Sequence, residues 1–246
     1  MDILPLKETL AKSARFASKF ATADHPPLPS ISESLNSSIG KKFIMALTGI
    51  SLILFLIVHL AGNLTLFIGE EAFNLYVESL DKIKPFIRVI EVVLAAIFIF
   101  HIVNGIKLYF ENRGARPEKY AVNGSRKNST LFSRTMAQTG SIIFIFLVIH
   151  LSTFWKAFNL DTHAADASYY NIVLEWFQIE WYAVLYVICM IILGFHLNHG
   201  FQSAFQTFGW NHNKYASLIK KIGTGYAVIM AVGFASIPIY FLLGGM

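Results

Sequence analysis

Five long apolar segments, separated by polar connections, dominate the pattern along this chain. They run over residues 43–67, 86–110, 136–158, 181–205 and 218–243. A bilayer core about 30 Å thick requires about 20 apolar residues in a helix, so each segment is long enough to cross it. The pattern therefore predicts an all-α fold, an integral membrane bundle of five transmembrane helices.

The distribution of basic residues predicts how the helices are oriented. Of the 20 Lys and Arg residues, only Lys82, Lys84, Arg88 and Lys156 lie on the side reached after the first and third segments. Basic residues concentrate in cytoplasmic loops, which predicts a cytoplasmic N-terminus and an outside C-terminus. We expect residues 1–40 to form a basic cytoplasmic segment, which lacks the apolar core of a secretory signal, and residues 41–246 to form the transmembrane domain.

Within the N-terminal segment, the stretch "LKETLAKSARFASKFA" is compatible with a basic amphipathic helix on the membrane surface and equally with a mobile terminus. Composition agrees with a membrane protein, because only 14% of the residues are charged and 55% are hydrophobic. The single cysteine, Cys189, excludes an intrachain disulfide and a cysteine-ligated iron–sulfur cluster. The absence of C-x-x-C-H excludes covalent c-type haem attachment.

Histidines account for nearly all the polar chemistry inside the apolar segments. At a rise of about 1.5 Å per residue, His59 on the first segment and His150 on the third lie near the outer face. His101 on the second segment and His196 on the fourth lie near the inner face, about 15 Å away by the same rise. The four residues thus form two pairs, each at one level of the membrane.

Two facing pairs of neutral imidazoles in a four-helix bundle are typical of bis-histidine b-type haem. Three alternatives remain. A membrane histidine can instead form an interhelical hydrogen bond, although four matched histidines weaken that interpretation. A proton-relay transporter usually has carboxylates at mid-membrane, whereas Glu91, the only one here, lies within about two turns of the end of its segment. Zinc is disfavoured, because each level offers two ligands rather than three or four.

The second and fourth segments share a local pattern, "HIVNG" from His101 and "HLNHG" from His196. In both, a glycine follows four residues later on the same helix face, where it leaves room for a flat macrocycle. The match aligns His196 with His101 and aligns His199 with Asn104. We therefore expect His196 to be the ligand and His199 to be a polar partner, such as a partner of a haem propionate.

Four stretches carry a resemblance to a known family: "GKKFIMALTGISLILFLIVHLAGNL", "FHIVNGIKLYFENRGARPEKY", "QTGSIIFIFLVIHLSTFW" and "GFHLNHGFQSAFQTFGW". Together they resemble the cytochrome b subunit of succinate dehydrogenases and fumarate reductases, in its single-chain, five-helix, dihaem b558 form. The resemblance implies a distal haem held by His59 and His150 and a proximal haem held by His101 and His196. Some members carry a helix IV glutamate two residues before the ligand, where this chain has Gly194, so no proton path is assigned there.

The resemblance also implies partners. An iron–sulfur subunit would dock on the cytoplasmic face and contact a flavoprotein with FAD, at a bacterial cytoplasmic membrane. The chain would carry electrons between that subunit and a membrane quinone, expected to be menaquinone. Lys41, Lys42 and Arg134 are candidate partners of the proximal haem propionates, although ordinary cytoplasmic anchors have the same pattern. No nucleic-acid partner is expected.

The quinone pocket is expected near the distal haem, at the outer ends of the first two segments. Its candidate residues are Asn63, Glu78, Asp81 and Lys82, although charges in this connection are equally compatible with solvated loop residues. Two other functions stay open. One is the cytochrome b anchor of another respiratory oxidoreductase, of the nitrate reductase or hydrogenase type, and the other is a haem-free proton-coupled transporter.

Overall fold

The computed structural model describes residue 13 and residues 30–114, 130–160, 168–210 and 212–245. Its long helices are α3 (Ser38–Asn63), α5 (Lys84–Gly114), α8 (Met136–His150), α11 (Glu180–Thr207) and α12 (Asn213–Leu242). Its short helices are α2 (Ile31–Asn36), α4 (Glu70–Asp81), α7 (Leu131–Arg134), α9 (Lys156–Asn159) and α10 (Tyr169–Phe177). A 3₁₀ turn, η1 (Leu64–Phe67), extends α3, and a π-helical segment, η2 (Leu151–Trp155), joins α8 to α9.

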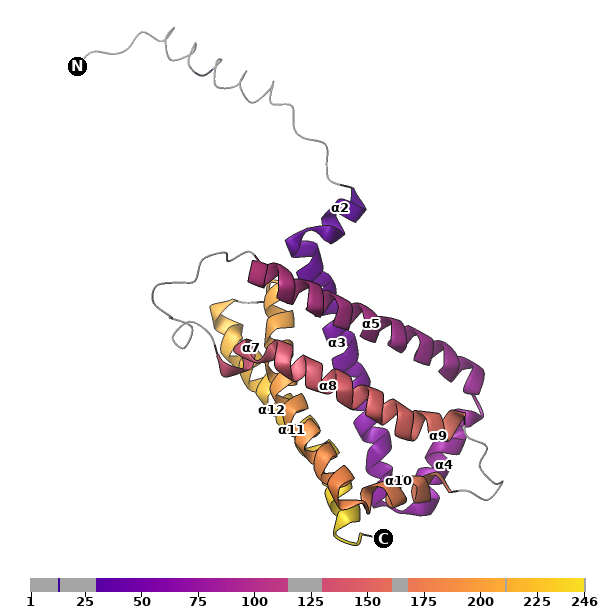
Figure 1. Cartoon of the computed structure of the whole chain (residues 1–246). Coiled ribbons are helices and arrows are strands. Elements are labelled where there is room, and N and C mark those ends of the chain that lie inside the picture. The colour runs from indigo at the N-terminus through magenta and orange to yellow at the C-terminus, as the bar shows by residue number, and fades with distance from the viewer. Residues whose placement is uncertain (1–12, 14–29, 115–129, 161–167, 211, 246) are drawn as a thin grey trace, which may run out of the picture. The chain divides into compact units, whose positions relative to one another are not determined.

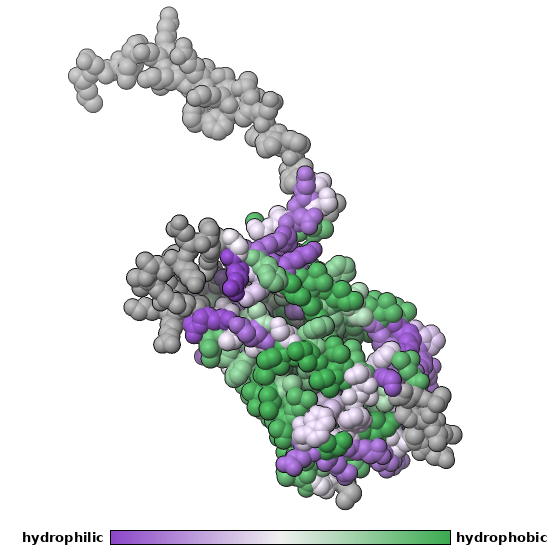
Figure 2. Space-filling view, in the orientation of Figure 1, coloured by the Kyte–Doolittle hydropathy of each residue, from purple (hydrophilic) through white to green (hydrophobic). Residues whose placement is uncertain are grey.

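Within the described residues, five helical stretches are long and apolar enough to cross a membrane, which confirms the predicted all-α bundle. They cover Ser38–Phe67, Lys84–Gly114, Met136–Asn159, Glu180–Thr207 and Lys214–Leu242. Figure 2 shows a broad apolar surface with polar residues gathered towards both ends of the bundle. Large exposed apolar side chains of the spans, such as Val58 and Val92 with exposed fractions of 67% and 69%, are those that lipid chains would cover.

Four of the long helices form a ring, and the fifth packs on its outside (Figure 1). Helix α3 packs against α5 and α11, while α8 packs against α11 and more loosely against α5. Helix α12 lies against α11 and α3, so it takes no place in the ring. The order around the ring puts α3 diagonally opposite α8 and α5 diagonally opposite α11.

Two short helices close one end of the bundle, and the sequence analysis did not predict them. Helices α4 and α10 occupy the first and third connections and are joined by Asn74, whose amide donates to Ser168 Oγ at 2.9 Å and accepts from Tyr170 N at 3.0 Å. The buried faces of these helices include Phe73 and Phe177, which belong to an aromatic core at this end. This cap fixes the ends of α3, α5, α8 and α11 relative to one another.

The chain divides into two compact units, residues 1–37 and 38–246. Within the first unit, α2 begins with a capping box, in which Ser30 N donates to Glu33 Oε2 at 2.7 Å and Glu33 N donates to Ser30 Oγ at 3.2 Å. The stretch considered above for a basic amphipathic helix lies outside the described residues except at residue 13. The predicted boundary after residue 40 remains an expectation from sequence.

Gly194 explains why α11 and α12 pack so closely. A Cβ atom at this position would lie 2.9 Å from Ala231 Cβ and 3.5 Å from the Ala227 carbonyl oxygen, both on α12. Neither neighbour is a flexible side-chain end that moves aside cheaply. The residue therefore faces α12, and a glutamate could not replace it without separating these helices.

We predict that Gly194→Ala destabilises the bundle by about 1–3 kcal/mol, because overpacking a tight contact forces the helices apart. Thermal unfolding of the detergent-solubilised protein measures this effect. The matched control is Gly225→Ala on α12, where a Cβ atom meets nothing within 4 Å. That control should be neutral or stabilising by up to about 1 kcal/mol, because alanine is the better helix former. Equal melting temperatures for the two variants would contradict this packing.

Candidate functional site: two diagonal histidine pairs

The first pair consists of His59, near the end of α3, and His150, the last residue of α8. Their ring centroids lie 5.8 Å apart, and the ring planes are nearly perpendicular at 88°. Phe55 stacks on His59 with a centroid separation of 5.2 Å, and Phe146 stacks on His150 at 5.7 Å. The pair therefore lies in an aromatic environment between diagonally opposite helices.

The second pair consists of His101 on α5 and His196 on α11. Their ring centroids lie 6.4 Å apart, with an interplanar angle of 69°. These two helices are also diagonally opposite in the ring. The structure thus brings together the same two pairs that the depth of the histidines predicted, in the interior of one four-helix ring.

Threonine hydroxyls fix the tautomer of the second pair. Thr48 Oγ1 on α3 lies 3.1 Å from His101 Nδ1, and its own proton is donated to the Ile44 carbonyl oxygen at 2.8 Å. Thr139 Oγ1 on α8 lies 3.2 Å from His196 Nδ1 and donates to the Met136 carbonyl oxygen at 3.1 Å. Because each hydroxyl proton is already used, each oxygen accepts from Nδ1–H, which leaves a lone pair on Nε2.

The first pair has different partners. His150 Nδ1 lies 3.3 Å from the hydroxyl oxygen of Tyr186, which also accepts a hydrogen bond from the Tyr182 hydroxyl at 2.9 Å. His59 Nδ1 has only a long contact of 3.5 Å with Asn63 Nδ2. The Asn63 amide donates a shorter bond, 2.8 Å, to the backbone oxygen of His59. Asn63, a candidate quinone residue, therefore lies directly beside the first pair.

Each threonine is followed by a glycine that makes room for the same imidazole. A Cβ atom at Gly49 would lie 3.5 Å from His101 Cε1, and one at Gly140 would lie 3.5 Å from His196 Cε1. The sequence analysis missed both residues. The signal was present, because a Thr-Gly dipeptide precedes His59 and His150 by the same eleven positions on the first and third spans.

Gly105 and Gly200, which were expected from sequence to leave room for a macrocycle, differ in the free space around them. A Cβ atom at Gly105 would lie 3.3 Å from Met45 Cε, so a side chain already fills that space. A Cβ atom at Gly200 would meet nothing within 4 Å. The expected room for a macrocycle is therefore present beside the His196 face, whereas at Gly105 the flexible end of a methionine occupies it.

The Thr contacts also give the spacing between the two pairs. Thr48 touches His101 and Thr139 touches His196, and each threonine lies eleven residues from the first-pair histidine on its own helix. At the helical rise this separates the two levels by about 16 Å. The value agrees with the separation of about 15 Å expected from sequence.

The residues predicted as partners of the inner haem propionates lie in different surroundings. Lys41 Nζ pairs with Glu111 Oε1 at 2.5 Å, and the Lys41 carbonyl accepts from Asn104 Nδ2 at 2.9 Å. Arg134 ends the short helix α7, and His199 is half-buried one turn from His196 on α11. Lys42 contributes to a pocket of about 410 Å³ between the start of α3 and the end of α11. That pocket is lined by Ile39, Lys42, Phe43, Ser203, Gln206 and Thr207.

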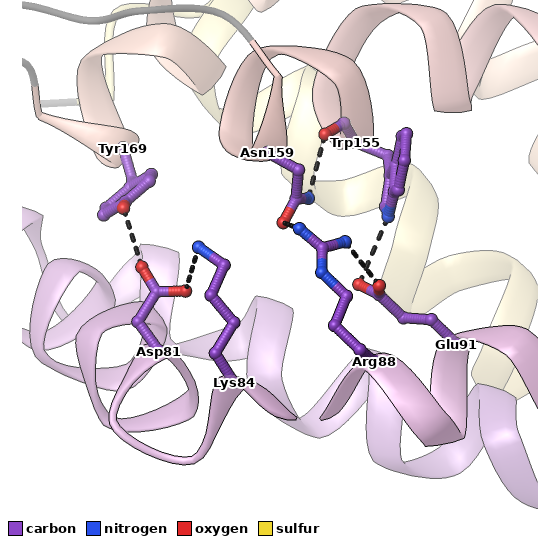
Figure 3. Close-up of polar contacts among 7 residues, drawn as sticks. All are labelled: Asp81, Lys84, Arg88, Glu91, Trp155, Asn159 and Tyr169. Carbon is purple, nitrogen blue, oxygen red and sulfur yellow. Dashed lines mark hydrogen bonds and ion pairs between the residues drawn. The ribbon is translucent and has the colours of Figure 1, made fainter. Parts of the chain in front are cut away.

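At the other end, the acidic quinone candidates belong to helix α4. Asp81 forms an ion pair with Lys84 at 2.9 Å and accepts a hydrogen bond from the Tyr169 hydroxyl at 3.0 Å (Figure 3). Glu78 lies one turn earlier on the same helix, and Lys82 follows its last residue. Asp81 therefore connects α4 to α5 and to α10, while 37% of its side chain remains exposed.

The residues fit a planar tetrapyrrole better than a bare metal ion. Among the described residues, no group of three or more His, Cys, Asp or Glu could hold a metal ion. With a metal–imidazole bond of about 2 Å on each side, two axial imidazoles place their ring centres about 6 Å apart. The centroid separations of both pairs, 5.8 and 6.4 Å, are close to this value. A bis-histidine haem needs no third protein ligand, because the macrocycle supplies the other four.

These features define a class, an all-α, multi-pass membrane protein with two histidine pairs stacked along the interior of its bundle. The family of succinate dehydrogenase/fumarate reductase transmembrane subunits matches the chain over residues 43–125 and 113–237. The chain belongs to this family and is a membrane subunit of such a complex. The membership confirms the resemblance found in sequence and favours it over the nitrate reductase, hydrogenase and transporter alternatives. The search of curated proteins gave no match, and neither did the search of solved structures.

The contact between Tyr169 and Asp81 predicts a measurable titration. Burial, together with the hydrogen bond to Asp81, raises the pKa of Tyr169 above its ordinary value of 10.0. The folded state therefore holds this proton more tightly than the unfolded chain, and the associated stabilisation is lost as the pH rises above about 10. Asp81→Asn should lower the Tyr169 pKa part of the way back, since burial remains.

Ultraviolet difference titration measures the Tyr169 pKa, with Tyr169→Phe identifying the signal of this residue. The same titration of Glu71→Gln, a change at an exposed position of α4, serves as the control. An identical Tyr169 pKa in the parent protein and in Asp81→Asn would show that the hydrogen bond does not form.

Proposed function

We propose that the chain is a dihaem cytochrome b anchor that carries electrons between a membrane quinone and a cytoplasmic iron–sulfur subunit. The observation that carries this proposal is the pairing of imidazoles across both diagonals of one ring. In the second pair, each Nδ1 lies within hydrogen-bond distance of a threonine hydroxyl oxygen, which leaves the lone pair of each ring on Nε2. That is the arrangement expected of axial ligands whose orientation neighbouring groups fix.

In this proposal His59 and His150 hold the outer haem b, and His101 and His196 hold the inner one. Each group, when bound, supplies reversible one-electron transfer. The protein residues orient the imidazoles, exclude water with aromatic side chains, and set the donor strength of each ligand through its Nδ1 partner. His199, Lys41, Lys42 and Arg134 remain candidates for binding propionates at the inner level. The ion pair with Glu111 already neutralises the charge of Lys41.

The distribution of charge supports an orientation of the two histidine pairs across the membrane. The ends of the spans that carry most Lys and Arg residues lie on the side of His101 and His196, which supports a cytoplasmic location for that pair. An iron–sulfur subunit bound there would exchange electrons with the inner pair and with a flavoprotein that holds FAD. The outer pair would face the quinone, for which we propose menaquinone, in a bacterial cytoplasmic membrane.

The pairing predicts which variants lose which haem. His59→Ala and His150→Ala should each remove the same low-spin haem signal, because either change deletes one axial ligand of the outer pair. His101→Ala should remove the other signal and leave the outer one. Electron paramagnetic resonance and a pyridine haemochrome assay of the purified complex measure both effects. A parent stoichiometry below two haems, or one shared signal lost from His59→Ala and His101→Ala alike, contradicts the proposal.

Helix α11 offers two histidines, and the structure favours His196 because its ring faces His101. His196→Ala should remove the inner low-spin signal. His199→Ala should retain it and shift only its potential, since a neighbouring polar group tunes charge without binding iron. A redox titration of both variants decides between them. If His199→Ala loses the inner signal and His196→Ala keeps it, the two assignments must be exchanged.

A further inference from the structure

Glu91 is the acidic residue farthest inside a described membrane span, seven positions from the start of α5. Both of its carboxylate oxygens are engaged (Figure 3). Arg88 Nη1 donates to Glu91 Oε2 at 2.6 Å, and the indole Nε1 of Trp155 donates to Glu91 Oε1 at 3.2 Å. Ionisable groups at this depth are costly and mark functional sites by default. The sequence alone indicates no role for Glu91.

The carboxylate lies on the outer-pair side of the bundle. Trp155 is the last residue of η2, which begins directly after His150. The hydrogen bond from Trp155 therefore places Glu91 about one helical turn outward of His150. On its own helix Glu91 precedes His101 by ten residues, about 15 Å, so it is remote from the inner pair.

The surrounding network is closed and holds the carboxylate in place. Arg88 Nη2 donates to Asn159 Oδ1 at 2.9 Å, and Asn159 Nδ2 donates to the Trp155 carbonyl oxygen at 2.9 Å. The Arg88 guanidinium also lies 5.6 Å from the centroid of the Trp155 ring. The π-helical turn shifts the register after His150, and such turns are frequent at functional sites. Here it accompanies the projection of Trp155 towards α5.

The network keeps hydrogen-bonding capacity for a ligand. Each Glu91 oxygen accepts one described bond and retains a lone pair, while Arg88 uses two of its five N–H groups. The side chains of Arg88 and Glu91 remain 36% and 29% exposed. Because α5 packs only loosely against α8, this polar patch opens towards lipid beside exposed apolar residues such as Val89 and Val92. A hydrophobic molecule in the bilayer can therefore reach it.

We propose that Glu91 is the proton acceptor for a membrane hydroquinone oxidised at the outer histidine pair, with Arg88 hydrogen-bonding the same quinone oxygen. The inference rests on the proposed function. In each of two rounds, an O–H bond of the hydroquinone would break, its proton would pass to a Glu91 oxygen, and one electron would pass to the redox group that His59 and His150 would hold. Glu91 then releases the proton to water at the outer face. Quinone reduction follows the reverse sequence.

Glu91→Gln in the intact complex tests this role, because glutamine keeps the shape and loses the exchangeable proton. A short-chain 1,4-naphthohydroquinone is the electron donor, and succinate oxidation by a water-soluble dye reports on the partner subunits alone. Hydroquinone oxidation should fall more than tenfold at saturating donor, with dye reduction unchanged. Glu91→Asp should recover part of the rate, and Glu71→Gln on α4 should behave like the parent protein.

A second readout does not depend on turnover. Redox-induced infrared difference spectra of the parent complex should contain a carboxyl band that Glu91→Gln lacks and Glu71→Gln retains. A full rate of hydroquinone oxidation in Glu91→Gln, or a band that persists in it, overturns the inference. Loss of the outer low-spin signal in Glu91→Gln also overturns it, since Glu91 would then hold α5 in place and not exchange protons. The proposed function fails separately, if the parent complex lacks two haems.

Discussion

Each inward-facing imidazole has two nitrogen atoms that can take part in hydrogen bonds. In the apolar interior, neither atom can rely on water as a partner. The structure satisfies one nitrogen within the bundle, most clearly through Thr48 and Thr139, whose oxygens accept from Nδ1 of His101 and His196. In these two rings the lone pair is then on Nε2, so a metal centre shared by both would require the two imidazoles to lie on opposite sides of it. This requirement explains why diagonally opposite helices present histidines to one another.

The same requirement explains the loose packing of α5. Its neighbours are α3 and, less closely, α8, and no side chain in its membrane span is fully buried. By contrast, α11 and α12 approach so closely that Gly194 has no room for a Cβ atom. The helices thus pack most closely at the contact between α11 and α12. They pack more loosely around α5, whose His101 faces His196. The Arg88–Glu91–Trp155 network joins α5 to η2 on its less well-packed side.

Sequence reasoning found the five spans and the grouping of the four histidines, because both follow from length and helical rise. It missed α4 and α10, since short amphipathic helices in polar connections have weak signals beside the long apolar segments. It also missed Thr48 and Thr139, because a Thr-Gly dipeptide in an apolar helix resembles ordinary packing until its contact with a histidine on another helix is seen. The orientation of Trp155 towards Glu91 depends on a π-helical turn, which local sequence did not indicate.

The most direct test of the central claim is a density map of the intact complex from electron cryo-microscopy. The account predicts two flat densities inside the four-helix ring, one joining His59 to His150 and the other joining His101 to His196. Their centres should lie about 16 Å apart, the distance set by eleven helical residues. A ring interior filled by side chains or lipid, or a planar group bound by helices that are neighbours in the ring, would contradict the account.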